Sequence, residues 1–312
     1  MMTGRVAFSL CLAIAPLLGC ADEPGSHDGG TSPDAAADAP PAVPADAAAG
    51  ADVGPDAATD PATDAAPEST ADLPADAAPD LASDGAPDVS RPGILSVPAD
   101  DPDIKVTNLI LKAGRDVPAY LATPSRTGTF AGILVVPDPE QGLTDHLRDV
   151  ARRLAKTGGC VALVPDVGAG ELESVRPELD AALAALAGQP QVGAHRLGAL
   201  GFGAGATRAL LFAAANLEVR AVVAYYGATP APADVMKTTG AAILGQYAAS
   251  DDAVNAGIPD LERVLKEAGK VFDKRSYPAP HGFNDDTAPG YDEAAAVAAW
   301  PFTVGWFEVY VQ

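Results

Sequence analysis

The sequence is poor in basic residues, in cysteine and in aromatic residues. The first two shortages each exclude a class of protein, and the third excludes a hydrophobic core in one segment. Only 20 Lys and Arg stand against 42 Asp and Glu, a formal net charge of −22, which excludes a surface built to hold nucleic acid phosphates. Three cysteines in 312 residues exclude a small fold held together by disulfides. Aromatic residues make up 5% of the chain, and none falls between Ala21 and Asp103, so this segment lacks the large side chains from which a core is built.

The acidic charge is concentrated in that same segment. Residues 21–103 hold 19 acids and one base, a net charge of −18, whereas residues 104–312 hold 23 acids and 18 bases, a net charge of −5. From Asp52 to Asp88 an acid recurs at every fourth residue among Ala and Pro. We expect residues 21–103 to be a disordered linker, because like charges repel, prolines stop helices and little apolar surface is available for burial. Cation binding by the regular aspartates is the alternative, but isolated carboxylates on an extended chain are poor chelators.

The amino terminus carries an apolar run that is too short to cross a membrane as a helix. This run, Val6 to Leu18, follows Arg5 and ends in Leu17-Leu18-Gly19-Cys20, which is the layout of a secretory signal peptide. The last four residues resemble the lipobox of bacterial lipoproteins, which implies cleavage before Cys20 and attachment of lipid to it. We expect residues 1–20 to be a lipoprotein signal peptide, and the mature protein to be exported and anchored to the membrane of the bacterial cell envelope. A plain cleavable signal is the alternative.

From Ile104 to Gln312 strand patterns alternate with helix patterns, over a length that suits one domain. Residues 104–111 and 117–122 predict a hairpin around a turn that contains glycine. Further strands are predicted at 132–136, 160–164, 197–201, 221–225, 242–247 and 271–277, and helices from Thr144 and at 177–186, 207–215, 259–268 and 293–310. This alternation indicates an α/β fold with a mainly parallel sheet and helices on both faces, in which ligands bind at the carboxyl ends of the strands.

A glycine-rich turn, Gly201 to Gly205, joins one predicted strand to one predicted helix. This is the setting of a nucleophile elbow, in which small outer residues permit a sharp turn and the middle residue attacks the substrate. The middle residue is Gly203, so the turn is kept and the nucleophile is missing. Dinucleotide binding is disfavoured because G-x-G-x-x-G fails at Ala206 and no acid follows the next strand. We therefore expect no cofactor.

The two partners that a hydrolase nucleophile needs stand after the next strands, in the order of this fold. Asp251 follows strand 242–247 and His281 follows strand 271–277. Asp251 is expected to accept a hydrogen bond from one ring nitrogen of His281, which leaves the other nitrogen facing Gly203 as a base.

Other polar and aromatic residues are expected to be structural. A metal site is disfavoured because one histidine among carboxylates is a loose signature, and its candidate ligands are Asp251, Asp252, His281, Asp285 and Asp286. His146 and His195 are expected at the edges of elements, away from the predicted pocket, and are assigned no chemistry. Cys160 and Thr207 are interpreted as packing residues rather than replacement nucleophiles. Trp300 and Trp306 are expected on the core face of the last helix, with Pro301 kinking or restarting it.

From about Gly132 to Phe307 the chain resembles the dienelactone hydrolases, also called carboxymethylenebutenolidases. The segments that carry the resemblance are LTDHLRDVARRLA at 143–155, VALVPD at 161–166, the elbow, SDDAVNAG at 250–257 and HGFNDDT at 281–287. The resemblance implies the α/β-hydrolase fold and hydrolysis of an ester or lactone by a Cys or Ser with His and Asp. It places the acid on Asp251, the base on His281, the nucleophile on Gly203, and the oxyanion-binding backbone amides on Ala204 and Glu140.

Two further departures from that family are visible. Relatives carry a glutamate near the nucleophile, but counting back from Gly142 puts Pro139 at that position, with Glu140 one residue out of register. Some relatives carry an arginine for the substrate carboxylate just beyond the histidine, where this chain has Asp285 and Asp286.

Two functions are consistent with these residues. One is a pseudoenzyme whose pocket binds a small ester-like or lactone-like molecule, or whose surface binds a protein partner that the sequence does not identify. The other is a surviving hydrolase in which His281 and Asp251 activate water in the room that Gly203 leaves.

Overall fold

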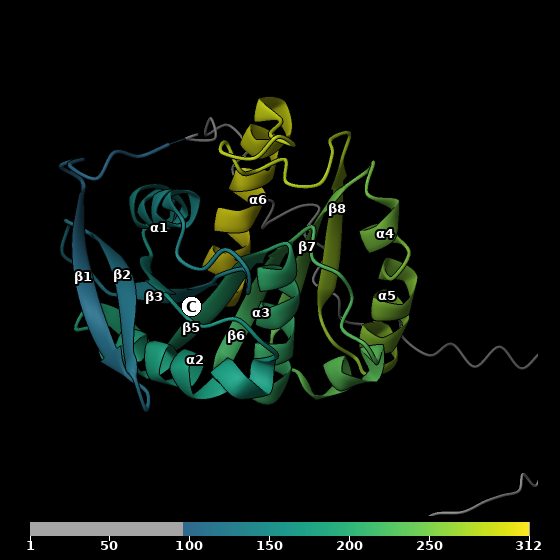
Figure 1. The fold of residues 1–312 in the computed structure, drawn as a ribbon, viewed down its shortest axis with the longest axis horizontal. Helices are drawn as coiled ribbons and strands as arrows, with labels where there is room; N and C mark the ends of the chain where they lie inside the picture. The colour runs from purple at the N-terminus through teal and green to yellow at the C-terminus, as the bar shows by residue number, and fades with distance from the viewer. Residues whose placement is uncertain (1–95, 312) are drawn as a thin grey trace, which may run out of the picture. The chain divides into compact units, whose positions relative to one another are not determined.

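The computed structural model describes residues 96–311, which form one eight-stranded sheet with helices on both faces (Figure 1). The strands are β1 (Ile104–Lys112), β2 (Asp116–Pro124), β3 (Phe130–Val136), β4 (Val161–Pro165), β5 (Val192–Phe202), β6 (Val219–Tyr225), β7 (Ala242–Ala248) and β8 (Phe272–Tyr277). Their order in the sheet is β1-β2-β4-β3-β5-β6-β7-β8. The hairpin β1–β2 pairs antiparallel with itself and with β4, and all other pairs are parallel. The expected mainly parallel sheet is confirmed.

Helices cover the two faces of the sheet in separate sets. Helices α1 (Asp145–Thr157) and α6 (Glu293–Tyr310) pack on one face, and α2 (Leu172–Ala187), α3 (Ala204–Ala215) and α5 (Ile258–Glu267) pack on the other (Figure 1). A short 3₁₀ helix, η1 (Ala233–Thr238), and the single-turn α4 (Asp252–Asn255) lie in connections. Because both faces are covered, every residue of β3 and β4 is buried, as their unbroken apolar runs predict.

Two helices run through an internal proline, and one of them begins earlier than the sequence predicts. Helix α2 begins at Leu172 rather than at residue 177, and it runs through Pro177, with Val175 and Leu179 buried on either side of the proline. Helix α6 runs from residue 293 to 310 as predicted, and it passes Pro301 without restarting. In both helices, burial of the surrounding apolar residues offsets the hydrogen bond that proline cannot donate.

The two tryptophans of α6 are core residues, as expected. Trp300 is 2% exposed and Trp306 is 5% exposed. Each indole N–H is satisfied, by Thr157 Oγ1 at 2.9 Å and by the carbonyl of Ala242 at 3.2 Å. Among residues 96–311, none of the helices has the length and apolar character that a membrane-spanning segment needs.

Residues 96–103, which the sequence analysis places in the linker, pack against α1. Val97 is 1% exposed and its amide donates to Asp149 Oδ1 of α1 at 2.8 Å, which also accepts the hydroxyl of Ser96 at 3.1 Å. Lys156, the last residue but one of α1, pairs with Asp101. The predicted signal peptide, Cys20 and the predicted linker up to residue 95 lie outside the described residues.

Candidate active site

The elbow predicted around Gly203 is present. Strand β5 ends at Phe202, Gly203 has φ +53° and ψ −127°, and α3 begins at the next residue. The turn is closely packed, because a Cβ atom on Gly201 would lie 2.5 Å from the carbonyl oxygen of Gly205, and one on Gly205 would lie 2.6 Å from that of Val136. Only glycine fits these two positions, so the backbone of a nucleophile elbow is kept.

His281 and Asp251 meet beside this elbow. Nδ1 of His281 and Oδ2 of Asp251 are 2.5 Å apart. The Asp251 side chain is 10% exposed and its other oxygen accepts the amide of Val254 at 3.2 Å, at the start of α4, so the carboxylate is held in place. The other ring nitrogen of His281, Nε2, lies 3.6 Å from the position of a Cβ atom on Gly203. The structure thus brings the three residues together in the arrangement that the sequence predicted.

An acidic side chain that the sequence analysis missed stands on the other side of Gly203. Oδ2 of Asp138 lies 3.7 Å from the same Cβ position. Counting back from Gly142 pointed to Pro139, but in the fold it is Asp138, two residues past the end of β3, that carries an acid to the nucleophile position. The signal available in the sequence was its place directly after a central strand, where parallel strands present their functional residues.

Asp138 also accepts a hydrogen bond from one of the two backbone amides that were predicted to bind the oxyanion. Its Oδ1 accepts the amide of Glu140 at 2.9 Å, so the Glu140 amide serves a substrate only when this contact is broken. The amide of Ala204 is at the first position of α3, where helix N–H groups have no partner within the helix. Of the two predicted donors, Ala204 is the better placed.

Arg208 forms hydrogen bonds to two of the loops that border the site. This α3 residue is 4% exposed, and its guanidinium donates to the carbonyl of Gly170 at 2.7 Å and to that of Pro137 at 3.5 Å. Burial lowers the pKa of the guanidinium, although neighbouring carboxylates act in the opposite direction. The loop that carries Asp138 is therefore fastened to the helix that begins at the elbow.

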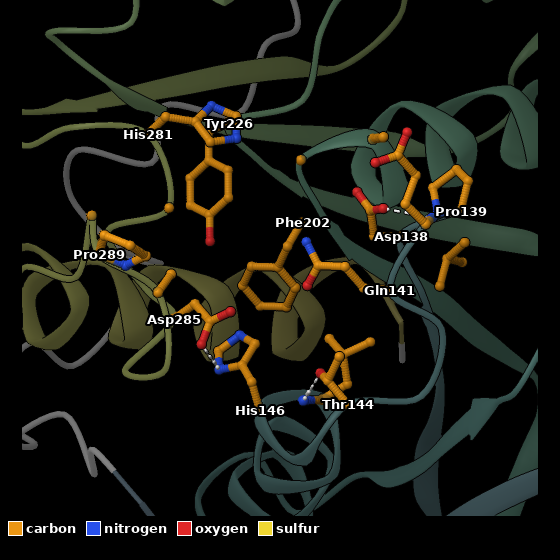
Figure 2. A pocket seen from close by; sticks show the side chains of 18 residues that line it. Asp138, Pro139, Gln141, Thr144, His146, Phe202, Tyr226, His281, Asp285 and Pro289 are labelled. Atoms are coloured by element: carbon orange, nitrogen blue, oxygen red, sulfur yellow. Dashed lines mark hydrogen bonds and ion pairs between the residues drawn. The ribbon is translucent and has the colours of Figure 1, made fainter.

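A cavity of about 590 Å³ opens over Gly203 and His281 (Figure 2). The ionisable side chains in its wall are Asp138, Glu140, His146, Tyr226, His281 and Asp285, and no Lys or Arg is among the described residues that line it. A second cavity of about 580 Å³ adjoins it across Gly203 and His281. Its wall is largely apolar, with Leu172, Leu211 and Val254. A ligand at Gly203 therefore has an acidic compartment on one side and a more apolar one on the other.

His146, to which the sequence analysis assigned no chemistry, lies in the wall of the first cavity, and that assignment was wrong about its position. It occupies the first turn of α1, which Thr144 caps by accepting the amide of Leu147 at 3.2 Å. Because this turn follows the loop after β3, it lies at the carboxyl edge of the sheet. The ring is 3% exposed, its centroid is 5.0 Å from that of Phe202, and burial lowers its pKa to about 4.

The remaining sequence candidates are placed elsewhere or act structurally. His195 is exposed on β5 and is not in the cavity wall. Cys160 is 3% exposed, burial raises its pKa to about 12, and it lies away from the elbow. Thr207 donates its hydroxyl to the carbonyl of Ala228 at 2.9 Å. The cluster Asp251, Asp252, His281, Asp285 and Asp286 is not assembled; within residues 96–311, the group close enough to share an ion is His146, Asp285 and Asp286.

Comparisons of the sequence and of the structure with known proteins point to the same family. Residues 168–311 match the profile described as the dienelactone hydrolase family. A protein of Methylorubrum extorquens named "Putative carboxymethylenebutenolidase" is 34% identical over 226 residues, which cover 62% of this chain and 77% of that protein. A protein of Salmonella typhi with the same name is 30% identical, with coverage of 63% and 84%. The crystal structure titled "Putative Dienelactone Hydrolase" from Klebsiella pneumoniae is 27% identical and superposes with a TM-score of 0.61, over 66% of this chain and 99% of that one.

Proposed function

The chain belongs to the dienelactone hydrolase family, and from that premise we propose that it is a member without covalent catalysis, whose site binds a small ester-like or lactone-like molecule. The observation that carries this proposal is Gly203 at the centre of an otherwise complete elbow. Formation of an acyl-enzyme needs an oxygen or sulfur on that residue, and glycine has neither. The cavities on both sides of Gly203 provide the space for a ligand.

The retained geometry argues that loss of the nucleophile has not collapsed the site. His281 keeps its contact with Asp251, and a Cβ atom on Gly203 would meet only ordinary van der Waals neighbours, at 3.6 and 3.7 Å. A Ser or Cys at this position therefore has room. Its main cost is the positive φ of the turn, about 1 to 3 kcal/mol for a residue other than glycine.

A second candidate function, hydrolysis by an activated water, is favoured by the pair of groups around that same point. His281 Nε2 and Asp138 Oδ2 both lie within 4 Å of the missing Cβ atom. A water there would donate to both groups. His281 would take one proton as the water oxygen attacks the carbonyl carbon, and the Ala204 amide would stabilise the oxyanion. Sites without a nucleophile retain about 10³ to 10⁴-fold acceleration over water, so this activity would be weak.

The test compares the native protein with Gly203→Cys, Gly203→Ser and His281→Ala on p-nitrophenyl acetate and on a dienelactone, each with a thermal melt. We expect the native protein to be no faster than His281→Ala, and Gly203→Cys to gain a burst of product equal to one acyl group per chain. The same burst in a Gly203→Ala control would count against the proposal, because alanine fills the space without supplying a nucleophile. Substantial native activity that His281→Ala abolishes would establish the water-activated function instead.

For the location of the protein we propose export and lipid anchoring through Cys20. The support is the order Leu17-Leu18-Gly19-Cys20 at the end of the apolar run. Expression with a labelled fatty acid is expected to label the native chain and not Cys20→Ser. Label on Cys20→Ser, or a soluble unlabelled native chain after cell fractionation, would contradict the anchor.

A further inference from the structure

We propose that His146, Asp285 and Asp286 form a binding site for one divalent transition-metal ion in the wall of the cavity. The three residues come from two distant segments, the first turn of α1 and the loop between β8 and α6. Nδ1 of His146 lies 3.6 Å from Oδ1 of Asp285 and 3.9 Å from Oδ1 of Asp286. Figure 2 shows the His146 ring and the Asp285 carboxylate turned toward one another below Phe202.

The observation that points to a ligand is the imidazole itself. His146 is 3% exposed by its side chain, and neither of its ring nitrogens has a hydrogen-bond partner among the described residues. A buried polar atom without a partner costs about 1 to 3 kcal/mol, so an imidazole with two such atoms calls for a partner. Both carboxylate oxygens lie slightly beyond hydrogen-bond distance of Nδ1.

A second orphaned group precedes the two aspartates in the chain. Asn284 is 2% exposed, and neither the oxygen nor the nitrogen of its side-chain amide has a partner among residues 96–311. Asp285, by contrast, is held firmly: its Oδ1 accepts the hydroxyl of Thr287 at 2.6 Å and the amide of the same residue at 2.9 Å. Hydrogen bonds of this kind orient carboxylates that ligate metals.

The distances and the charges both suit a cation. Ligand atoms at about 2.0 to 2.2 Å from an ion lie about 3 to 3.5 Å from one another in tetrahedral or octahedral geometry. The ligand atoms of the three residues lie within 4.8 Å of one another, so they have to draw closer around the ion, and Asp285 is the nearer of the two carboxylates to His146, at 3.6 Å. Asp286, which is 49% exposed, has the freedom to move. Arg153, two turns further along α1, is paired with Asp149 at 3.0 Å. Among the described residues it forms no ion pair with Asp285 or Asp286.

The ligand set indicates which ions fit. One imidazole nitrogen with two carboxylate oxygens suits Zn²⁺, Mn²⁺ or Fe²⁺ better than Mg²⁺ or Ca²⁺, which prefer oxygen ligands alone. His146 and Asp285 line the same cavity as His281 and Gly203, but the proposed ligand set includes neither of the latter two residues. This inference therefore goes beyond the proposed function and is tested independently of it.

The test measures binding of Zn²⁺ and Mn²⁺ to the mature full-length chain by isothermal titration and by metal content after dialysis, with Mg²⁺ for comparison. The variants are His146→Gln, Asp286→Asn and Thr287→Val, and the controls are His195→Ala and Asp145→Asn, a distant histidine and an exposed acid next to His146. We expect one tightly bound ion per native chain, and at least about 100-fold weaker binding in the first two variants. Thr287→Val, which loses one hydrogen bond to Asp285, should bind about 10-fold more weakly.

Weak binding to the acidic residues 21–103 is common to all variants and cancels in the comparison. Replacement of the ion by Co²⁺ should give visible absorption bands that His146→Gln lacks. If His146→Gln does not fold, Asp286→Asn carries the test: its melting temperature without metal should equal the native value, but added Zn²⁺ should no longer raise it. Equal affinity in native chain and Asp286→Asn, or no ion bound above the weak background, would overturn the proposal.

Discussion

The ring of Tyr226 packs against the ring of His281, with their centroids 4.8 Å apart and their planes at 55°. Tyr226 follows β6 with a positive φ of 39°, and its amide donates to the carbonyl of Gln246 at 2.7 Å. One face of the imidazole is thus held by an aromatic ring, while Nδ1 is held by Asp251. Neither of these two contacts involves residue 203.

Because Asp251 and Tyr226 hold His281 without residue 203, Asp251 should be needed for activity once a nucleophile is restored at that position. In a Gly203→Cys background, we expect Asp251→Asn to lower the rate on p-nitrophenyl acetate by about 10³ to 10⁴-fold, because an amide favours the wrong tautomer of the histidine. Asparagine still caps α4, where Asp251 Oδ1 accepts the amide of Val254, so the melting temperature should change little. Asp251→Ala should lose the same activity and also stability. An equal rate in Gly203→Cys with and without Asp251→Asn would show that Asp251 does not act on His281.

Arg208 should contribute to the stability of the fold through its hydrogen bonds to carbonyl groups. Among the described residues no carboxylate forms an ion pair with it. Its guanidinium is buried and donates to the carbonyls of Gly170 and Pro137. We expect Arg208→Met to lower the free energy of unfolding by roughly 2 to 3 kcal/mol in urea titrations, because methionine fills the space but leaves the carbonyls unpaired. Arg263→Met is the control, because Arg263 pairs with Glu267 on the surface and should leave the urea midpoint unchanged. A similar midpoint for both variants would contradict this role.

Gln246 stands at the centre of a buried network behind the site. Its nitrogen donates to Thr303 Oγ1 at 2.7 Å and to the carbonyl of Ala299 at 3.1 Å, and its oxygen accepts the Tyr277 hydroxyl at 2.6 Å. We expect Gln246→Leu to cost roughly 2 to 4 kcal/mol in the free energy of unfolding, because the buried Tyr277 hydroxyl loses its partner and Thr303 Oγ1 and the Ala299 carbonyl each lose one hydrogen bond. Gln191→Leu, whose hydrogen bonds are 3.3 and 3.5 Å long and partly exposed, should cost less than about 0.5 kcal/mol. A Gln246→Leu protein as stable as the native one would refute the network's importance.

The Cys160 thiol should be protected from reagents and should make stability fall at high pH. In a Cys11→Ser, Cys20→Ser chain it is the one remaining thiol, and we expect Ellman's reagent at pH 8 to modify it only after unfolding in urea. Burial raises its pKa from 9.0 to about 12. The unfolded chain therefore loses the proton first, and stability falls as the pH rises through this range.

The matched comparison for that pH effect is Cys160→Ala in the same background. The difference in the free energy of unfolding between the two proteins should narrow as the pH rises from 9 toward 12, because the titrating tyrosines are common to both. A difference that stays constant over this range would contradict the raised pKa of the thiol.

The sequence predicted the strands, the elbow and the Asp251–His281 pair because these depend on local patterns. A run of apolar residues followed by glycines, or by an acid or a histidine, marks the end of a strand, and the fold brings such ends to one edge. The position of Asp138 and His146 depends instead on the path of one loop, residues 137–144, between β3 and α1. That path is determined by tertiary contacts such as the one between Arg208 and Pro137, which no local pattern records.

The extent of α2 escaped prediction for a related reason. Pro177 is an unfavourable residue inside a helix when it is considered alone. In the fold, Val175 and Leu179 bury their side chains on the inner face of α2, and this packing decides the outcome. Helix propensity is a weak predictor of helix boundaries where the neighbouring side chains are fully buried.

The way the chain enters the domain has a mechanical consequence. Any pull on the chain ahead of Ser96 is transmitted first to α1, through the bonds of Ser96 and Val97 to Asp149 and through the pair Lys156–Asp101. Strand β1 lies at the edge of the sheet and would be peeled from β2 one hydrogen bond at a time if the load reached it directly. The segment 96–103 takes up that load before the edge strand does, so the domain resists tension from its amino-terminal side at a helix rather than at the margin of its sheet.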